Sequence, residues 1–203
     1  MPELSALSVI LASASATRAA LLAEAGLALR TNPAGIDENA LKSALRANGT
    51  EAGDAALALA EAKALPVSVR HEGALVIGAD QMLVLDRRWF DKPRSAAEAR
   101  EHLLVLRGRR HELVTAVCVA RDGAVLWRHV ERPSLVMRAF SAAFLDAYLA
   151  TIGDDVLTTV GGYRLEGRGV QLMARVDGDF FSILGLPLLP LLEFLRGHGA
   201  VPS

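Results

Sequence analysis

Short apolar runs separated by polar turns mark the strands that the sequence predicts. Residues 7–11 read as a buried strand, and the runs at 74–79 and 82–85 read as two adjoining strands. Two Asp-Gly pairs predict hairpins: Asp122-Gly123 between strands 114–120 and 124–130, and Asp177-Gly178 between strands 171–176 and 180–184. Hairpins add antiparallel strands to the sheet, so we expect a mixed sheet.

Stretches with helical spacing lie between these strands. We expect helices over residues 17–25, 51–65, 95–106 and 141–151, and a last one that begins near Pro187. Ser95 and Glu98 form a capping box, and Pro66 is expected to end the second helix. The alternation predicts a mixed α/β fold, an elongated β-sheet flanked by helices. We expect a single domain over residues 1–203, with two lobes and a central cleft.

Composition narrows the class of protein. Of 203 residues, 52% are hydrophobic and 22% charged, which excludes a disordered chain. The 22 Lys and Arg residues nearly balance the 23 Asp and Glu residues, for a formal charge of −1, so we expect neither nucleic acid nor a membrane as a partner. With Cys118 as the lone cysteine and no basic residue before Arg18, we expect a cytoplasmic protein.

The segment Ser13-Ala-Ser15-Ala-Thr17-Arg18 carries the first candidate chemistry. It joins a strand to a helix, and a helix N-terminus carries partial positive charge that disfavours another cation. Arg18 therefore makes sense if an anion binds there, held by serine hydroxyls, helix N–H groups and the guanidinium. The alternative is that one serine caps the helix and Arg18 points to solvent.

Further candidates are charged residues in unusual positions. Asp80 follows an apolar run, where a strand end would present its carboxylate to a metal or a water molecule; the alternative is a turn aspartate. Glu38 could be a second acidic ligand, and Lys63 and Lys92 could neutralise phosphate charge. Each of these three could instead be a solvated surface charge. P-loop, dinucleotide-binding, zincin and nucleophile-elbow motifs are absent from the sequence.

Taken together, these segments resemble the Maf family of nucleoside triphosphate pyrophosphatases. The matching segments follow in order along the chain: Leu11 to Ser15 with Arg18, Gly35 to Glu38, Ala62 to Ala64, Gly78 to Asp80, Lys92-Pro93, His111 with Thr115, Gly161 to Tyr163 with Gly167, and Gly185 to Pro187. The resemblance implies a divalent cation, Mg or Mn, and in many members a homodimer. It also implies hydrolysis of a nucleoside triphosphate to the monophosphate and pyrophosphate.

The resemblance carries roles to matching residues one at a time. It implies that Asp80 activates water and touches the metal, and that Glu38 is a second metal or water ligand. It implies that the triphosphate is held by a set of polar and basic residues: Ser13, Ser15, Arg18, Lys63 and Lys92.

Three positions concern the base. Gln81 and Glu166 resemble the 7-methyl-GTP pyrophosphatase branch more than the dTTP/UTP branch, whereas Thr17 matches neither closely. A carboxylate accepts hydrogen bonds from the N–H edge of guanine but repels the acceptor oxygens of uracil or thymine. Glu166 could instead form a salt bridge with Arg164 or Arg168. The alternatives for the whole chain are a dTTP/UTP pyrophosphatase and a non-catalytic nucleotide-binding regulator of cell division.

Overall fold

A computed structural model describes residues 7–202 of the chain, which fold as two compact units. Of the described residues, unit 1 comprises 7–80, 115–131 and 185–202, and unit 2 comprises 81–114 and 132–184. The chain passes between the units several times, and strands β3 and β5 contribute residues to both. The expectation of a single domain with a central cleft stays a prediction.

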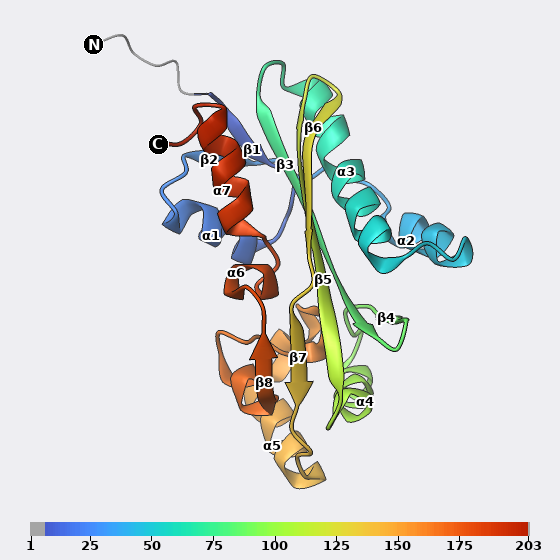
Figure 1. Ribbon diagram of the computed structural model, residues 1–203. Helices are drawn as coiled ribbons and strands as arrows, with labels where there is room; N and C mark the ends of the chain where they lie inside the picture. The colour runs from blue at the N-terminus through green and yellow to red at the C-terminus, as the bar shows by residue number, and fades with distance from the viewer. Residues whose placement is uncertain (1–6, 203) are drawn as a thin grey trace. The chain divides into compact units, whose positions relative to one another are not determined.

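The expected mixed α/β fold is confirmed. The eight strands form one sheet in the order β2-β1-β3-β5-β7-β8, with β4 paired to β3 and β6 paired to β5 (Figure 1). The strands are β1 (Val9–Leu11), β2 (Leu29–Thr31), β3 (Leu75–Leu85), β4 (Arg88–Phe90), β5 (Arg110–Arg121), β6 (Ala124–Glu131), β7 (Ser134–Met137) and β8 (Met173–Asp177). Strand β1 runs parallel to β2 and β3, whereas the β3–β4, β5–β6, β5–β7 and β7–β8 pairs are antiparallel.

Helices flank the sheet in both units. They are α1 (Ala16–Glu24), α2 (Glu38–Ala47), α3 (Ala52–Arg70), α4 (Ala96–Leu106), α5 (Ala142–Ile152), α6 (Phe180–Ile183) and α7 (Leu188–Gly197). Three 3₁₀ turns follow α5: η1 (Gly153–Leu157), η2 (Val160–Gly162) and η3 (Arg168–Leu172). In the part of the chain that the structure describes, no helix is both long and apolar enough to span a membrane.

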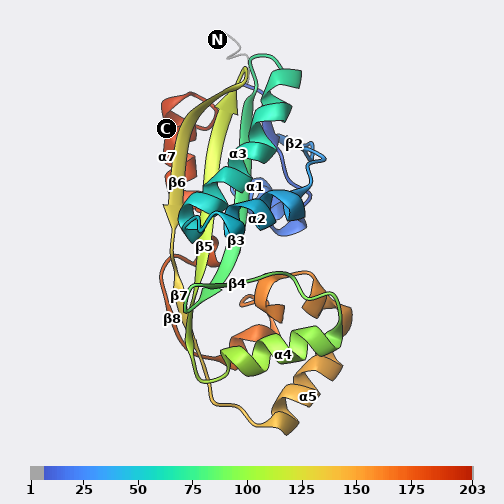
Figure 2. The ribbon, with the colours of Figure 1, turned by 90° about the vertical axis from the view of Figure 1, so that its right-hand side faces the viewer.

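In unit 1, helices α3 and α7 cover opposite faces of strand β6. Arg128 on β6 pairs with Glu61 on α3, whereas the ring of the preceding residue, Trp127, stacks on Phe194 of α7 at 5.2 Å. Successive side chains of a strand point to opposite faces, so the two helices lie on either side of the sheet. Figures 1 and 2 show this layering.

Gly78 lets α3 lie unusually close to β3. A Cβ atom at this position would lie 2.1 Å from the Ala60 carbonyl oxygen and 2.9 Å from Ala64 Cβ. A glycine inside a strand is typical of such close backbone approach. The contact brings the middle of α3, where Lys63 lies, against the strand residues that follow Gly78.

In unit 2, helices α4 and α5 and the 3₁₀ turns surround a hydrophobic core (Figure 2). Leu103 and Leu106 of α4, Leu135 of β7 and Leu145 of α5 are fully buried in it. The Ser95 cap that the sequence predicts is present, since its hydroxyl accepts a hydrogen bond from the Glu98 amide at 3.2 Å.

Most predicted elements are confirmed, but three predictions are wrong. Helix α3 continues through Pro66 to Arg70, because burial of Val67 and Ser68 and the 2.9 Å bond from Ser68 Oγ to the Leu65 carbonyl hold its last turn. The two predicted strands at 74–79 and 82–85 are one strand, β3 (Leu75–Leu85), since pairing with Lys63 lets Asp80 lie inside a strand. Residues 180–183 form helix α6 rather than a strand, capped by the Asp179 carboxylate.

Candidate active site

A lysine bridges two carboxylates at the centre of the candidate site in unit 1. Lys63 Nζ lies 2.7 Å from Asp80 Oδ1 and 2.7 Å from Glu38 Oε2. The Lys63 side chain is only 8% exposed and that of Asp80 12%, whereas that of Glu38 is 54% exposed. The three residues come from α3, β3 and α2, so the fold brings together charges that are distant in the sequence.

Asp80 lies inside β3, not at its end as the sequence predicts. It nevertheless lies beyond the carboxyl end of the neighbouring strand β1. The parallel register pairs Leu11, the last residue of β1, with Ile77. Asp80 is therefore three residues past the carboxyl end of the neighbouring parallel strand, where ligands of α/β sheets commonly bind. Gly78 and Asp80 are two residues apart in the strand, so both face α3, which carries Lys63.

The Ser13 to Arg18 segment lies at the same sheet edge, between β1 and α1. Ser15 caps α1, because its hydroxyl accepts from the Arg18 amide at 3.3 Å. The Ser13 hydroxyl accepts from the Ser15 amide at 3.2 Å and from Arg18 Nη1 at 3.3 Å. Thr17 is half-buried in the first turn of α1. The capping alternative thus holds for Ser15.

The alternative that Arg18 points to solvent is wrong. The residue is buried, and its Nε donates to the Gly185 carbonyl at 2.8 Å while Nη1 donates to the Ala79 carbonyl at 2.8 Å. Burial lowers the pKa of Arg18, an effect that the charges of Asp80 and Glu38 oppose. Among the residues that the structure describes, Nη2 has no hydrogen-bond partner, so it is the guanidinium nitrogen left for a ligand.

The other predicted site residues belong to unit 2. The Gln81 amide nitrogen donates to the Ser182 and Ile183 carbonyls at 2.9 and 3.1 Å, which ties β3 to α6. Lys92 is exposed in the segment between β4 and α4.

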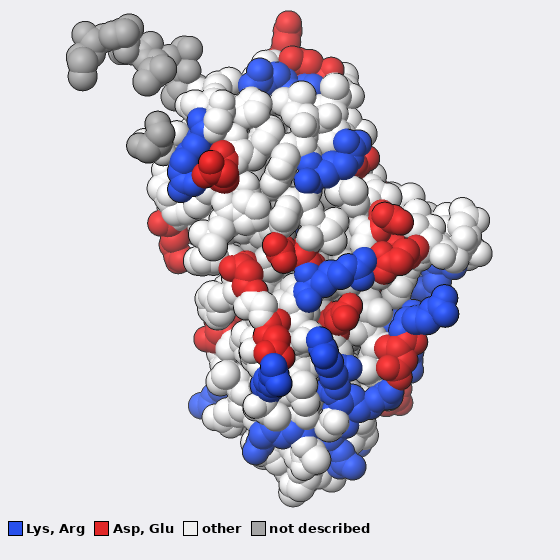
Figure 3. Space-filling model, in the orientation of Figure 1, with Lys and Arg blue, Asp and Glu red and all other residues white. Residues whose placement is uncertain are grey.

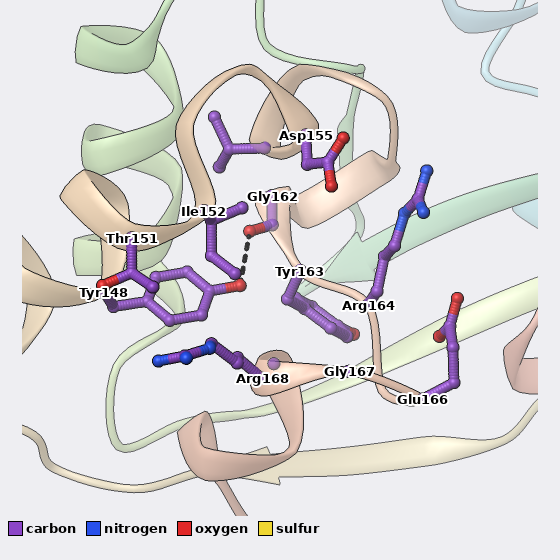
Figure 4. A pocket seen from close by; sticks show the side chains of 12 residues that line it. Tyr148, Thr151, Ile152, Asp155, Gly162, Tyr163, Arg164, Glu166, Gly167 and Arg168 are labelled. Carbon is purple, nitrogen blue, oxygen red and sulfur yellow. Dashed lines mark hydrogen bonds between the residues drawn. The ribbon is translucent and has the colours of Figure 1, made fainter.

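Glu166 lines a pocket of about 320 Å³ in unit 2 (Figure 4). The pocket floor is formed by the buried residues Tyr148, Val156 and Tyr163, and its rim carries exposed charged side chains. Arg164 Nη2 donates to Thr158 Oγ1 at 3.2 Å, and within residues 7–202 no ion pair links Glu166 to Arg164 or Arg168. The salt-bridge alternative for Glu166 is therefore not realised, and its carboxylate is exposed.

The carboxylates of Glu38 and Asp80 fit a hard divalent cation. The described residues contain no cluster of three His, Cys, Asp or Glu side chains able to hold a metal. However, Mg²⁺ commonly binds one or two carboxylates together with substrate phosphates, rather than a cage made by protein alone. Glu38 and Asp80 both contact one ammonium nitrogen, so their oxygens already converge on a single positive charge.

The structure thus gathers seven of the predicted site residues in unit 1: Ser13, Ser15, Thr17, Arg18, Glu38, Lys63 and Asp80. The remaining three, Gln81, Lys92 and Glu166, belong to unit 2. Sequence reasoning missed the role of Gly78, although a glycine within an apolar strand could have indicated it. The face drawn in Figure 3 carries both acidic and basic side chains, in line with the near-zero net charge.

Comparison with known proteins decides the family. The model of the Maf-like protein family matches residues 8–198. The chain belongs to the Maf family. A nucleoside triphosphate pyrophosphatase of Rhodospirillum rubrum is 53% identical over 96% of each chain. A 7-methyl-GTP pyrophosphatase of Rhizobium meliloti is 51% identical over 96% of this chain and 98% of its own, and that of Mesorhizobium japonicum is 49% identical over 95% and 97%.

Proposed function

We propose that this Maf-family nucleoside triphosphate pyrophosphatase hydrolyses 7-methyl-GTP to 7-methyl-GMP and pyrophosphate. The observation that carries the reaction type is the Lys63 ammonium 2.7 Å from both Asp80 and Glu38. This cluster brings together a general base, a second carboxylate and a cation, which are groups that phosphoryl transfer needs.

Asp80 is the general base of the proposed reaction. Its carboxylate takes a proton from a water molecule, whose oxygen then attacks the α-phosphorus. The bond from that phosphorus to the oxygen bridging to the β-phosphate breaks, and pyrophosphate leaves with the electron pair. Hydrogen bonding to Lys63 holds Asp80 Oδ1, which fixes the direction from which the carboxylate approaches water.

Positive and polar groups hold the triphosphate and stabilise its charge. In unit 1 these are Lys63, the free Nη2 of Arg18 and the hydroxyls of Ser13 and Ser15. A divalent cation, Mg²⁺ or Mn²⁺, held by Glu38 and Asp80 would supply further positive charge to the phosphoryl oxygens when bound.

Glu166 selects the base in this proposal. Its exposed carboxylate lacks an ion-pair partner among the described residues, so it can accept hydrogen bonds from the N1–H and N2–H₂ groups of guanine. The positive charge of 7-methylguanine favours a carboxylate further, whereas the carbonyl oxygens of uracil oppose it. Relatives named 7-methyl-GTP pyrophosphatase at 49–51% identity support this substrate.

The test compares pyrophosphate release from 7-methyl-GTP and UTP by wild type and Glu166→Gln, with Mg²⁺ or Mn²⁺. We expect the ratio of kcat/KM for 7-methyl-GTP over UTP to fall at least about tenfold, because one strong charged hydrogen-bonding group is lost. Glu101→Gln, an exposed glutamate of α4, is the matched control and should leave the ratio unchanged.

Two results would count against the proposal. An equal loss of kcat/KM on both nucleotides in Glu166→Gln would show that Glu166 does not recognise the base. If the wild-type protein prefers UTP or dTTP, the proposed reaction type stands but 7-methyl-GTP is not the preferred substrate.

A further inference from the structure

A buried hydrogen bond lies at the start of the turn that carries Glu166. The Tyr163 hydroxyl oxygen is 2.6 Å from His111 Nε2 of strand β5. His111 is 1% exposed and Tyr163 5%, and their rings pack edge to face with centroids 5.7 Å apart. Nothing in the proposed reaction uses either group.

Burial keeps both groups of this bond uncharged. It lowers the pKa of His111 to about 4 and raises the pKa of Tyr163, so at neutral pH the imidazole is uncharged and the phenol keeps its proton. The bond therefore joins two uncharged groups, a phenol and a neutral imidazole. A neutral bond between two buried partners has one geometry, because neither group can turn to water instead.

The residues before Tyr163 are also tied to the core. Gly161 and Gly162 have φ values of 83° and 70°, in the left-handed region that favours glycine. The Tyr148 hydroxyl donates to the Gly162 carbonyl at 3.2 Å, which Figure 4 shows, and Thr159 Oγ1 donates to the Tyr163 carbonyl at 2.9 Å.

The residues after Glu166 close the turn on itself. The Gly167 amide donates to the Arg164 carbonyl at 3.3 Å. A Cβ atom at Gly169 would lie 2.4 Å from that same carbonyl oxygen, so the chain returns against its own backbone. Glu166 is thus exposed on a short turn whose two ends are fixed.

We propose that His111 and Tyr163 are positioning residues for base recognition, because their hydrogen bond fixes the turn that presents the Glu166 carboxylate. The inference rests on the proposed role of Glu166. Displacements of about 1 Å at a positioned group can cost up to 10²-fold in rate, so the anchor is expected to matter although it touches no substrate.

The experiment is a double-mutant cycle between Tyr163→Phe and Glu166→Gln, with steady-state kinetics on 7-methyl-GTP and UTP. Tyr163→Phe keeps the ring and removes only the hydroxyl. We expect it to raise KM for 7-methyl-GTP about 3- to 10-fold, with kcat and the UTP constants nearly unchanged, as befits one lost hydrogen bond. In the Glu166→Gln background it should change the nucleotide ratio no further.

Three further variants separate positioning from stability. Leu106→Val removes one methylene from the same core, and it should lower the melting temperature without changing the nucleotide ratio. His111→Gln keeps a hydrogen-bonding group beside Tyr163. It should therefore lower the ratio of kcat/KM for 7-methyl-GTP over UTP less than His111→Leu does. It also serves as the test if Tyr163→Phe does not fold.

Each outcome decides between the two proposals. If Glu166→Gln lowers the ratio and Tyr163→Phe does not, the positioning role is wrong and the proposed substrate stands. If the two substitutions act additively, Tyr163 does not act through Glu166 and the role is wrong as well. If Glu166→Gln leaves the ratio unchanged, base recognition by Glu166 fails and the positioning role fails with it.

Discussion

The Lys63 ammonium nitrogen lies 2.7 Å from Asp80 Oδ1, and both side chains are nearly buried. The pair exists because α3 approaches β3 at Gly78, two residues before Asp80 in the strand. The positions of Gly78, Lys63 and Asp80 therefore depend on one another, and changes to any of them should disturb both stability and turnover.

Removing the lysine should leave Asp80 unpaired. We expect Lys63→Met to lower the free energy of unfolding by about 2–4 kcal/mol, because a largely buried carboxylate loses its partner. The double variant Lys63→Met/Asp80→Asn should recover part of this loss, since no unpaired charge remains. Urea denaturation of both variants checks this, and equal losses in the two would contradict the pairing.

Closing the space at Gly78 should be more damaging than adding a methyl group elsewhere. A Cβ atom there would meet the Ala60 carbonyl oxygen at 2.1 Å, so α3 must move away from β3. We expect Gly78→Ala to cost more than about 2 kcal/mol of stability and to reduce kcat. Gly197→Ala at the end of α7, with nothing within 4 Å, is the control and should stay within about 0.5 kcal/mol of wild type.

Arg18 should not be replaceable by lysine. Its Nε and Nη1 donate to two backbone carbonyls, those of Gly185 and Ala79, and one ammonium group cannot reach both in the same geometry. We expect Arg18→Lys to lower the free energy of unfolding by about 1.5–3 kcal/mol, measured by denaturant titration. Arg30→Lys on the exposed strand β2 should be neutral, and an equally neutral Arg18→Lys would refute the anchoring role.

His111 should make the protein less stable in mild acid. Burial lowers its pKa to about 4 in the folded state, against 6.5 for the ordinary group, so between these values the unfolded chain binds more protons. Stability conferred by this residue is therefore complete above pH 6.5 and is lost as pH falls toward 4.

Between pH 7.5 and pH 5, wild type should lose about 1–2 kcal/mol more unfolding free energy than His111→Gln, which cannot titrate. Urea denaturation at the two pH values gives this difference. Parallel losses in the two proteins would show that His111 already carries its ordinary pKa.

Local patterns predicted the fold wherever local chemistry decides it. The Asp122-Gly123 turn has φ values of 50° and 80°, as a tight hairpin requires, and the Ser95 and Ser141 caps begin α4 and α5. Prediction failed at Pro66, where burial overrides a local preference, and at Asp179, where a local cap was overlooked. Pro66 stays inside α3 because its neighbours Val67 and Ser68 are buried, and residues after Gly178 form a helix because Asp179 caps it.

The site was less predictable than the fold. The spacing of Glu38, Lys63 and Asp80 gives no indication that they meet, because α2, α3 and β3 are brought together only by the folded chain. Only the resemblance to a family linked these residues in advance. The burial of Arg18 could not be read from the sequence either, since two of its partners are backbone carbonyls 61 and 167 positions away.

The role of Asp80 as general base is tested by pyrophosphate release from 7-methyl-GTP with Mg²⁺ or Mn²⁺ by wild type, Asp80→Asn and the control Asp54→Asn. Asp54 is an exposed residue in the first turn of α3. We predict that Asp80→Asn lowers kcat by at least about 10²–10³-fold while the far-UV spectrum and folding cooperativity persist, since a general base contributes about 10²–10⁴-fold. Asp54→Asn should match wild type. A folded Asp80→Asn protein with wild-type turnover would show that Asp80 is not the general base.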